Sequence, residues 1–389
     1  MRTIGVVTVA RSDYGIYLPV LKRIVADSEL KLHLIVAGMH LTEEFGHTVD
    51  LIEADGFAVG DRVDMLHTSN TPEGISKSGG LGMIGFAESF VKNRPDILLV
   101  LGDRFEMHAA AIAALPFKIP VAHVHGGEVT SGAIDDALRH SMTKLSHLHF
   151  VTTDAYRSRV EQLGEDPCRV VVSGAPSLDN LQDIELLSSA EFEGVSRVPA
   201  GEPFLLVTFH PVTLEYEHTE AHFGELLAVL AQRQEPVLFT MANADTYGRT
   251  VNRMIQEFVS ANASRAYSVD NLGTQRYFSA MSLAAVMLGN SSSGIIEAAT
   301  FGLPVVNIGR RQEGRVRGLN VIDSPPDRTS ILAALDRALS SAFCEGFKRL
   351  TNPYGQGNAS ERIVDGLKSA VLDDTLLIKR FRDLPGLPS

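Results

Sequence analysis

The sequence of 389 residues is short of cysteine, tryptophan and positive charge. Its two cysteines, Cys168 and Cys344, are too few and too far apart to indicate a disulfide framework or a metal-binding motif. Acidic residues outnumber basic ones by 47 to 35, and the net charge of −12 argues against nucleic acid or an anionic membrane as a partner. No apolar run reaches the roughly 18 residues of a membrane-spanning helix. The apolar start TIGVVTVA lacks the features of a signal peptide, so we expect a cytoplasmic protein.

Short apolar segments rich in valine, isoleucine and leucine recur along the chain, and amphipathic segments lie between them. Continuous apolar strands that alternate with helices are typical of buried parallel strands in βα units. The sequence therefore predicts an α/β protein. The expected strands are 3–10, 31–37, 96–101, 120–125, 147–152, 169–173, 204–209, 236–241, 264–269, 283–288 and 304–308, and the expected helices include 17–27, 83–93, 106–116 and 135–146.

A chain of this length exceeds one ordinary core, so two domains are expected. The strand pattern pauses in the proline-containing stretch 176–203 and then restarts. We predict two Rossmann-like, doubly wound domains, 1–178 and 179–357, and a segment 358–389 whose helix packs back on the first domain. Because ligands bind beyond the carboxyl ends of the strands in open α/β sheets, we expect the two domains to face across a cleft that holds the site.

Charged residues follow the expected strands of the first half. Arg11 stands between the first strand and a helix, where it suits a phosphate group. The glycine spacing of a dinucleotide fingerprint is absent, which argues against a nicotinamide cofactor. Asp103 ends an apolar strand, where it either caps the next helix or belongs to an active site.

The segment HVHGGE places His123, His125 and Glu128 around two glycines, which let a backbone approach a ligand closely. Its spacing could supply three metal ligands, but the acidic neighbourhood explains the residues without a metal, and we expect none. Asp135 and Asp136 follow at the start of a helix. Carboxylates gathered near one another raise the pKa of one of them, which suits general acid and base chemistry.

The second half supplies candidate anion-binding groups. His210 ends a strand just before a proline, on the expected cleft side. Ser291, Ser292 and Ser293 open a helix, where hydroxyls and free N–H groups form a cradle for a diphosphate. Glu297, one turn later, suits the hydroxyls of a ribose. Positive charge is added after the next strand by Arg310, Arg311 and Arg315.

With these residues in place, the sequence resembles the hydrolysing UDP-N-acetylglucosamine 2-epimerases of sialic-acid-type pathways over about residues 3–370. The matching motifs are RSDYG, GMHLTEEFG, LGDR, HGGEVTSGAIDDALRH, TFHPVT, GNSSSGIIEA, GRRQEGR and NPYGQGNASERI. The resemblance implies a glycosyltransferase-B-like fold, a UDP-sugar substrate, a homodimer or homotetramer, and no cofactor.

The resemblance also implies roles for individual residues. Catalytic roles fall on Asp103, His125, Glu128, Asp135 and His210, and substrate contacts fall on Arg11, Asp13, His40, Arg104, Asp136, Asn243, Ser291, Ser292, Ser293, Glu297 and Arg311. Some branches of the family have a catalytic glutamate at the place of His125. The identity of the base that removes the C2 proton therefore stays undecided among Glu128, His125 and Asp135. We favour Glu128 or Asp135, with His125 as an orienting or proton-donating partner.

The expected reaction converts UDP-N-acetylglucosamine to UDP and N-acetylmannosamine by elimination to a 2-acetamidoglucal, followed by hydration. Four alternatives remain: the same reaction on UDP-2,4-diacetamido-2,4,6-trideoxyglucose, a non-hydrolysing epimerase, a glycosyltransferase of the same fold, and a non-catalytic nucleotide-sugar-binding regulator. The last would be expected to lack Asp103 or Asp135, and both are present.

Overall fold

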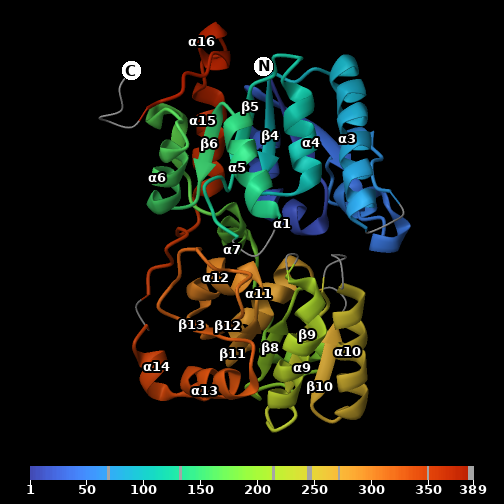
Figure 1. Cartoon of the computed structure of the whole chain (residues 1–389), viewed down its shortest axis with the longest axis vertical. Coiled ribbons are helices and arrows are strands. Elements are labelled where there is room, and N and C mark those ends of the chain that lie inside the picture. Colours follow the sequence, from blue (N-terminus) through green and yellow to red (C-terminus); the bar gives the residue numbers. More distant parts are fainter. Residues whose placement is uncertain are drawn as a thin grey trace. The chain divides into compact units, whose positions relative to one another are not determined.

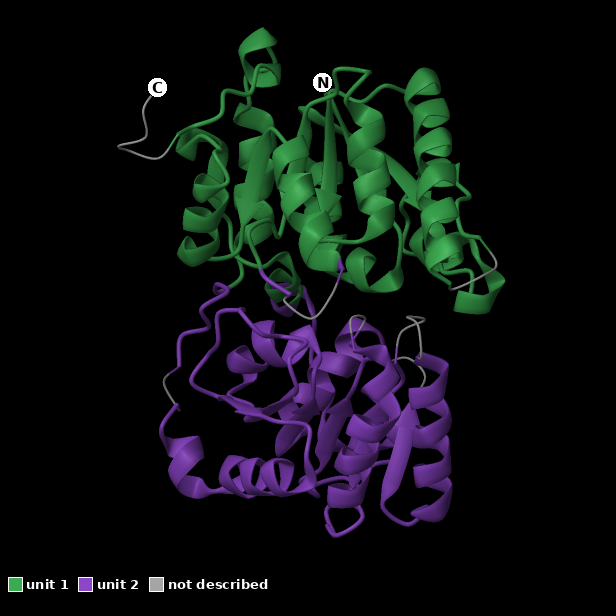
Figure 2. Cartoon of the chain, in the orientation of Figure 1, with its two compact units in different colours: residues 1–128, 135–180, 357–389 green, residues 129–134, 181–356 purple. Residues whose placement is uncertain are grey.

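The structure is a computed structural model of residues 1–389. It describes the chain apart from 68–70, 131–133, 213–214, 243–247, 270–271, 348–349 and 384–389. The chain divides into two compact units (Figure 2). Unit 1 comprises 1–128, 135–180 and 357–389, and unit 2 comprises 129–134 and 181–356.

Unit 1 is built on a parallel sheet, whose described strands run in the order β3-β2-β1-β4-β5-β6-β7. Strands β2 and β3 are added on one side of β1, and β4 to β7 are added on its other side, so the strand order reverses between β1 and β4. The strands are β1 (Arg2–Thr8), β2 (Leu30–Ala37), β3 (Val59–Val63), β4 (Ile97–Leu101), β5 (Val121–Val124), β6 (Leu148–Val151) and β7 (Val170–Val172). The helices, most of them labelled in Figure 1, are α1 (Arg11–Ala26), α2 (Val49–Ala54), α3 (Pro72–Lys92), α4 (Phe105–Ala114), α5 (Asp135–Leu145), α6 (Asp154–Gln162), α7 (Asn180–Asp183, whose first residue is in unit 1), α15 (Ala359–Ser369) and α16 (Asp374–Leu377).

Unit 2 repeats the plan with described strands in the order β10-β9-β8-β11-β12-β13. The strands are β8 (Leu205–Thr208), β9 (Val237–Thr240), β10 (Ala266–Val269), β11 (Val286–Gly289), β12 (Val305–Ile308) and β13 (Val321–Ser324). The helices are α8 (Ser189–Ser196), α9 (Thr219–Leu230), α10 (Gly248–Ala261), α11 (Gly273–Leu283), α12 (Ser292–Ile296), α13 (Arg328–Leu339) and α14 (Ser341–Glu345). The strand pairs in both described sheets are parallel, which confirms the predicted α/β class.

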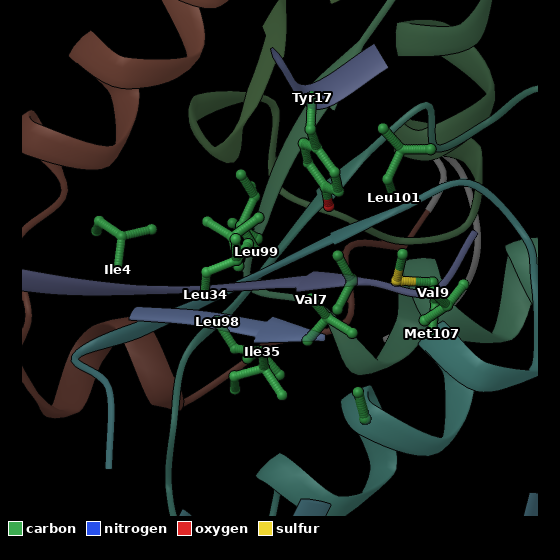
Figure 3. Close-up of a cluster of buried hydrophobic side chains, with 14 of the residues drawn as sticks. Ile4, Val7, Val9, Tyr17, Leu34, Ile35, Leu98, Leu99, Leu101 and Met107 are labelled. Atoms are coloured by element: carbon green, nitrogen blue, oxygen red, sulfur yellow. The ribbon is translucent and has the colours of Figure 1, made fainter. Parts of the chain in front are cut away.

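The central strands of unit 1 are buried on both faces. Figure 3 shows Ile4 and Val7 of β1, Leu34 of β2, and Leu98 and Leu99 of β4 in one apolar cluster, all without solvent exposure. Burial of each such side chain contributes about 1.5–3 kcal/mol. This rigid layer fixes the positions of the loops at the carboxyl ends of its strands.

The C-terminal segment packs within unit 1. Ile363, Val364 and Leu367 of α15 belong to the core of that unit. The buried Asp179 carboxylate accepts hydrogen bonds from the backbone N–H groups of Ala359 and Ser360 at 3.0 and 2.7 Å, and so caps the start of α15. In the described part of the chain, no helix combines the length and the apolar character needed to cross a membrane.

Candidate active site

Polar side chains gather at the carboxyl ends of neighbouring strands in each sheet. In unit 1, Arg11 follows β1, Asp103 follows β4 and His125 follows β5, and these three strands are adjacent. In unit 2, His210, Ser291 and Arg311 follow β8, β11 and β12, which are also adjacent. Each set therefore stands at the edge where open parallel sheets bind ligands.

A buried arginine joins the acid/base residues of unit 1. Arg139 of α5 is 2% exposed and forms an ion pair with Asp103. Its Nη1 donates a hydrogen bond of 2.8 Å to the main-chain oxygen of His125 and lies 3.9 Å from Glu128 Oε2. Because a buried guanidinium is stable only when carboxylates or carbonyls face it, Arg139 fixes the ends of β4 and β5 relative to α5.

His125 and Glu128 form a hydrogen-bonded pair. The distance between His125 Nδ1 and Glu128 Oε1 is 2.7 Å, and the same oxygen accepts from the Thr152 hydroxyl at 3.2 Å. An ionised carboxylate can only accept, so Nδ1 carries the proton, and Nε2 is the nitrogen left for another partner. Among the described residues, none forms a hydrogen bond with His125 Nε2, which is buried.

His125 also has an unusual backbone, with a φ of +64°. Such left-handed conformations are uncommon for residues other than glycine, and they concentrate at functional sites. The His125 N–H donates to the Phe150 carbonyl of β6 at 3.0 Å, and the Arg139 guanidinium binds its carbonyl. Both peptide groups that flank the imidazole are therefore fixed.

The glycines of HVHGGE have packing roles in the structure. A Cβ at Gly127 would lie 2.5 Å from the Tyr156 carbonyl oxygen, and one at Gly126 would lie 3.0 Å from His123 Nδ1. His123 donates from Nε2 to the Gly102 carbonyl at 2.8 Å, and burial lowers the pKa of His123 to about 3. His123 is thus a neutral side chain that ties β5 to the end of β4.

The two aspartates at the start of α5 are partly exposed. Asp135 and Asp136 occupy the first turn, where the helix dipole favours negative charge. Asp136 Oδ2 lies 3.6 Å from His140 Nε2 on the following turn. Asp135 begins the same helix that carries Arg139, so α5 sets the position of the aspartate relative to the buried arginine.

Asp13 and His40 make their hydrogen bonds inside unit 1. Asp13 accepts from the Thr8 hydroxyl at 2.7 Å and from the backbone N–H groups of Val9 and Ala10 at 2.9 and 2.7 Å, and burial raises its pKa to about 6. Since the Thr8 hydroxyl donates to Asp13, it accepts from His40 Nε2 at 2.9 Å. Burial lowers the pKa of His40 to about 4, so this imidazole is neutral near pH 7. These contacts fix the loop from which the exposed Arg11 begins α1, and the expected contact of Asp13 and His40 with a substrate stays a prediction.

Arg104 makes a bidentate ion pair with Glu106, a residue that the sequence analysis did not single out. The distances from Arg104 Nε and Nη2 to the two carboxylate oxygens are 3.2 and 2.9 Å, and Glu106 has no solvent exposure. The pair fixes the Arg104 side chain beside the end of β4. The signal in the sequence was the spacing within GDRFE, which puts both charges at the start of α4.

Asn290 connects the candidate residues of unit 2. Its side-chain oxygen accepts from the His210 N–H, and its side-chain nitrogen donates to the His210 carbonyl, both at 2.7 Å. Its main-chain oxygen accepts from Arg311 Nη1 at 3.0 Å and from Gln312 Nε2 at 2.8 Å. A Cβ at the preceding Gly289, with φ +128°, would lie 1.9 Å from the Thr208 carbonyl oxygen. One buried residue, Asn290, thus holds the ends of β8, β11 and β12 together, through its side-chain amide and its main-chain oxygen.

The serine-rich turn follows directly. Ser291 caps α12, its hydroxyl accepting from the Ser293 N–H at 3.3 Å, which confirms that these serines open a helix. Ser292 is the first residue of α12, which spans only five residues, so free N–H groups rather than a long helix dipole would attract an anion here. Glu297 ends α12 and is buried. Asn243 lies outside the described residues.

The polar loops at the strand ends of two parallel sheets place this chain in the class of two-unit Rossmann-like α/β enzymes. A family model described as UDP-N-acetylglucosamine 2-epimerase matches residues 22–368, and the chain belongs to this family.

Three known proteins illustrate the similarity. The chain is 36% identical over 384 residues to the GDP/UDP-N,N'-diacetylbacillosamine 2-epimerase (hydrolyzing) of Campylobacter jejuni, covering 98% of this chain and 99% of the relative. It is 36% identical over 379 residues to the UDP-N,N'-diacetylbacillosamine 2-epimerase (hydrolyzing) of Legionella pneumophila, covering 97% and 99%. The solved structure of a UDP-GlcNAc 2-epimerase from Neisseria meningitidis bound to UDP-GlcNAc has the same fold, with a TM-score of 0.81, 19% identity, and coverage of 95% of this chain and all of that one.

The Asn290 amide provides a test of the unit 2 site. We expect Asn290→Ala to lower the affinity for UDP about tenfold or more, because the loop that carries His210 loses its side-chain anchor to the end of β11. It should also cost about 1–3 kcal/mol of stability, since buried backbone groups lose their partners. Calorimetric titration with UDP and urea unfolding measure the two effects.

Asn320→Ala is the matched control. Asn320 is equally buried in unit 2 and donates to the Leu303 carbonyl at 2.8 Å, at the amino end of β12. This variant should lose stability but keep its UDP affinity. Equal UDP affinities in the two variants would contradict the assigned role of Asn290.

Proposed function

We propose that this chain is a hydrolysing 2-epimerase, which converts a UDP-linked 2-acetamido sugar into UDP and the free sugar inverted at C2. The observation that carries the proposal is the His125–Glu128 pair, fixed beside Asp103 by the buried Arg139, in a chain of this family. It combines an imidazole with carboxylates at the carboxyl edge of the sheet, which is the chemistry that proton removal from carbon requires.

The favoured substrate is UDP-N,N'-diacetylbacillosamine, in which a second acetamido group is at C4 and a methyl group is at C5. Two relatives at 36% identity, matched over nearly their whole length, bear that substrate in their names. The free product would be 2,4-diacetamido-2,4,6-trideoxymannose. UDP-N-acetylglucosamine is the second candidate, because it gives the matching family its description.

The reaction has two balanced steps. In the first, a base takes the proton from C2 while the C1–O bond to the diphosphate breaks, and the electron pair of the C2–H bond forms the C1=C2 bond of a 2-acetamidoglucal. UDP leaves with both electrons of the C1–O bond. In the second step water adds its oxygen to C1, and a proton reaches C2 on the opposite face. The sum is UDP-sugar plus water giving UDP plus the 2-epimer.

His125 is our candidate for the base. Its Nε2 is a buried ring nitrogen without a hydrogen-bond partner among the described residues, and Glu128 Oε1 is engaged by His125 Nδ1 and by the Thr152 hydroxyl. This reverses the preference drawn from the sequence, which favoured Glu128 or Asp135. Glu128 has no solvent exposure and acts on the substrate through His125, by fixing its tautomer and stabilising the imidazolium that forms.

The carboxylates have separate tasks in this proposal. Asp103, ion-paired with Arg139 and 23% exposed, stabilises the positive charge that develops on the sugar ring as UDP departs. Asp135, partly exposed at the start of α5, handles the proton for the second step.

The leaving diphosphate is assigned to donors at the strand ends of unit 2. His210, Arg311 and the N–H groups of the turn at Ser291, Ser292 and Ser293 offer donors to its oxygens, which lowers the barrier to C1–O cleavage. Glu297 would accept hydrogen bonds from ribose hydroxyls. Elimination and hydration transfer no electrons to a cofactor, so the proposal includes none.

Incubation with each UDP-sugar in D₂O tests the function. We expect UDP release and a free product that carries one deuterium at C2, with a higher kcat/KM for UDP-N,N'-diacetylbacillosamine than for UDP-N-acetylglucosamine. NMR follows both signals. A released sugar with C2 still protonated would exclude the elimination, and recovery of only a UDP-linked epimer would indicate a non-hydrolysing enzyme. A higher kcat/KM for UDP-N-acetylglucosamine would select the second substrate.

Substitutions in the pair test the base. His125→Ala should lower the rate of C2 deuteration by about 10²–10⁴-fold, the usual contribution of a general base. Glu128→Gln should lose less, because the amide oxygen can still accept from Nδ1 while the negative charge is gone. Both variants should keep their affinity for UDP, which is assigned to other residues.

His108→Gln is the control, since His108 is a partly buried histidine of α4 that contacts Ser141 at 2.9 Å. It should leave the exchange rate unchanged. If Glu128→Gln proves inactive while His125→Ala is only impaired, Glu128 is the base and the assignment to His125 is wrong.

A further inference from the structure

A lysine near the C-terminus of the chain binds the carboxyl end of α5. Lys379 follows α16, and its side chain is 18% exposed. Its ammonium group donates hydrogen bonds to the main-chain oxygens of Thr143, Lys144 and Ser146 at 3.3, 2.9 and 2.5 Å. Thr143 and Lys144 belong to the last turn of α5, and Ser146 lies just beyond it. Lys379 is therefore a cap for α5 that comes from a distant part of the sequence.

The end of α5 favours such a group. The last carbonyl oxygens of a helix lack donors within the helix and carry partial negative charge, so a cation with several N–H donors stabilises them. The basic residue in the last turn of α5 itself is Lys144. Its ammonium group donates instead to the Leu163 carbonyl at 3.0 Å and to Glu165 at 2.6 Å. Lys379 thus takes the place that a lysine of the helix itself often has.

A buried carboxylate holds the Lys379 ammonium group at this position. Glu165 is 1% exposed, and its Oε2 lies 2.7 Å from Lys379 Nζ and 3.1 Å from His149 Nε2 of β6. Burial alone would raise the pKa of Glu165, but hydrogen bonds from His149, Lys144 and Lys379 lower this pKa to about 2. The carboxylate is therefore ionised near pH 7 and attracts the ammonium group.

The backbone on both sides of Lys379 is also bound within unit 1. Before it, Arg169 donates to two main-chain oxygens of α16 at 2.9 and 2.6 Å. After it, the Arg382 N–H donates to the Gly164 carbonyl at 3.0 Å, and a Cβ at Gly164 would lie 2.6 Å from Phe381 Cε2. Figure 1 shows this segment, in red, running from α16 toward α6. The position of the cap is thus set by contacts other than its own.

The helix that Lys379 caps also carries part of the acid/base site. Asp135 stands in the first turn of α5, and Arg139 further along it faces the Asp103 carboxylate and the His125 main-chain oxygen. The helix has only 11 residues. Because a rigid secondary-structure element carries a displacement from one end to the other, the end that Lys379 binds affects where Asp135 and Arg139 lie.

We propose that Lys379 is a positioning residue for the acid/base site, which holds α5 in place through the carbonyl oxygens at its carboxyl end and the buried Glu165. The residue does not contact the reacting atoms, and it acts through Arg139 and Asp135. The catalytic part of this inference rests on the proposed function, whereas the capping of α5 does not.

The variant Lys379→Met tests the proposal in the full-length chain. We expect kcat for C2 deuteration to fall about ten- to hundredfold, because a displacement of about 1 Å at catalytic groups is enough for such a loss. The affinity for UDP, which is assigned to unit 2, should stay within about twofold of the wild type. The backbone amides of α5 should exchange their hydrogens about tenfold faster or more, since the end of the helix opens more easily. Kinetics, calorimetric titration and hydrogen exchange followed by mass spectrometry measure these effects.

Two further variants separate the cap from a general loss of stability. Lys379→Arg keeps a cation with several N–H donors and should recover most of kcat. Lys368→Met is the matched control, because Lys368 of α15 is also a partly buried lysine of the C-terminal segment. It lies 2.9 Å from Asp27 and 3.2 Å from Glu29 and does not belong to the α5 cap. It should keep the wild-type kcat and the wild-type exchange in α5. Urea unfolding gives the folded fraction by which each kcat is corrected.

Each other outcome counts against the proposal. Unchanged exchange in α5 of Lys379→Met would show that Lys379 does not hold the helix, and faster exchange with an unchanged kcat would show that the cap does not position the site. Equal losses of kcat in Lys379→Met and Lys368→Met would indicate general destabilisation. A kcat of Lys379→Arg as low as that of Lys379→Met would contradict the role of the positive charge. If the wild type itself introduces no deuterium at C2, the proposed function fails, and the exchange in α5 still tests the cap.

Discussion

The buried guanidinium of Arg139 is the contact on which the acid/base site of unit 1 depends. It faces the Asp103 carboxylate after β4, the main-chain carbonyl of His125 after β5, and Glu128. A charge this deeply buried is costly unless carboxylates and carbonyls face it, so Arg139 holds the two loop segments after β4 and β5 in one arrangement. The left-handed backbone of His125 is stable because its carbonyl and its N–H are both bound.

In unit 2, a neutral side chain, the amide of Asn290, takes the place that the charged Arg139 has in unit 1. The Asn290 side-chain amide binds both backbone groups of His210, and the main-chain oxygen of Asn290 accepts hydrogen bonds from Arg311 and Gln312. An amide suits this place because it adds no charge among residues assigned to a diphosphate. In both units, one buried residue orients the residues that we propose to act on the substrate.

The sequence predicted the central strands well, because buried parallel strands appear as continuous apolar runs. It missed β3 and β13, which lie at sheet edges and alternate exposed and buried residues in segments such as VGDRV. The helix expected at 83–93 begins at Pro72, and the glycines and serines of its first half concealed it. The strand-end positions of Asp103, His125, His210 and Ser291 were predicted correctly, since they follow from strand order alone.

What the sequence could not show is which side chains satisfy one another. Arg139 stands in a helix with ordinary amphipathic spacing, and nothing in ALRH distinguishes it from a solvated arginine. Asn290 looked like part of the serine turn. The choice between His125 and Glu128 as the base depended on burial and on a contact of 2.7 Å, which spacing does not reveal.

The central claim is that Glu128 orients His125 as a neutral base with Nε2 unprotonated. Long-range ¹H–¹⁵N correlation NMR on protein labelled with ¹⁵N-histidine measures this directly, with the His125 signals assigned by their loss in His125→Gln. At neutral pH we predict the proton on Nδ1 and a bare Nε2, and a weaker preference for that tautomer in Glu128→Gln, where only a neutral amide oxygen accepts from Nδ1. A proton on Nε2 with Nδ1 bare would contradict the account.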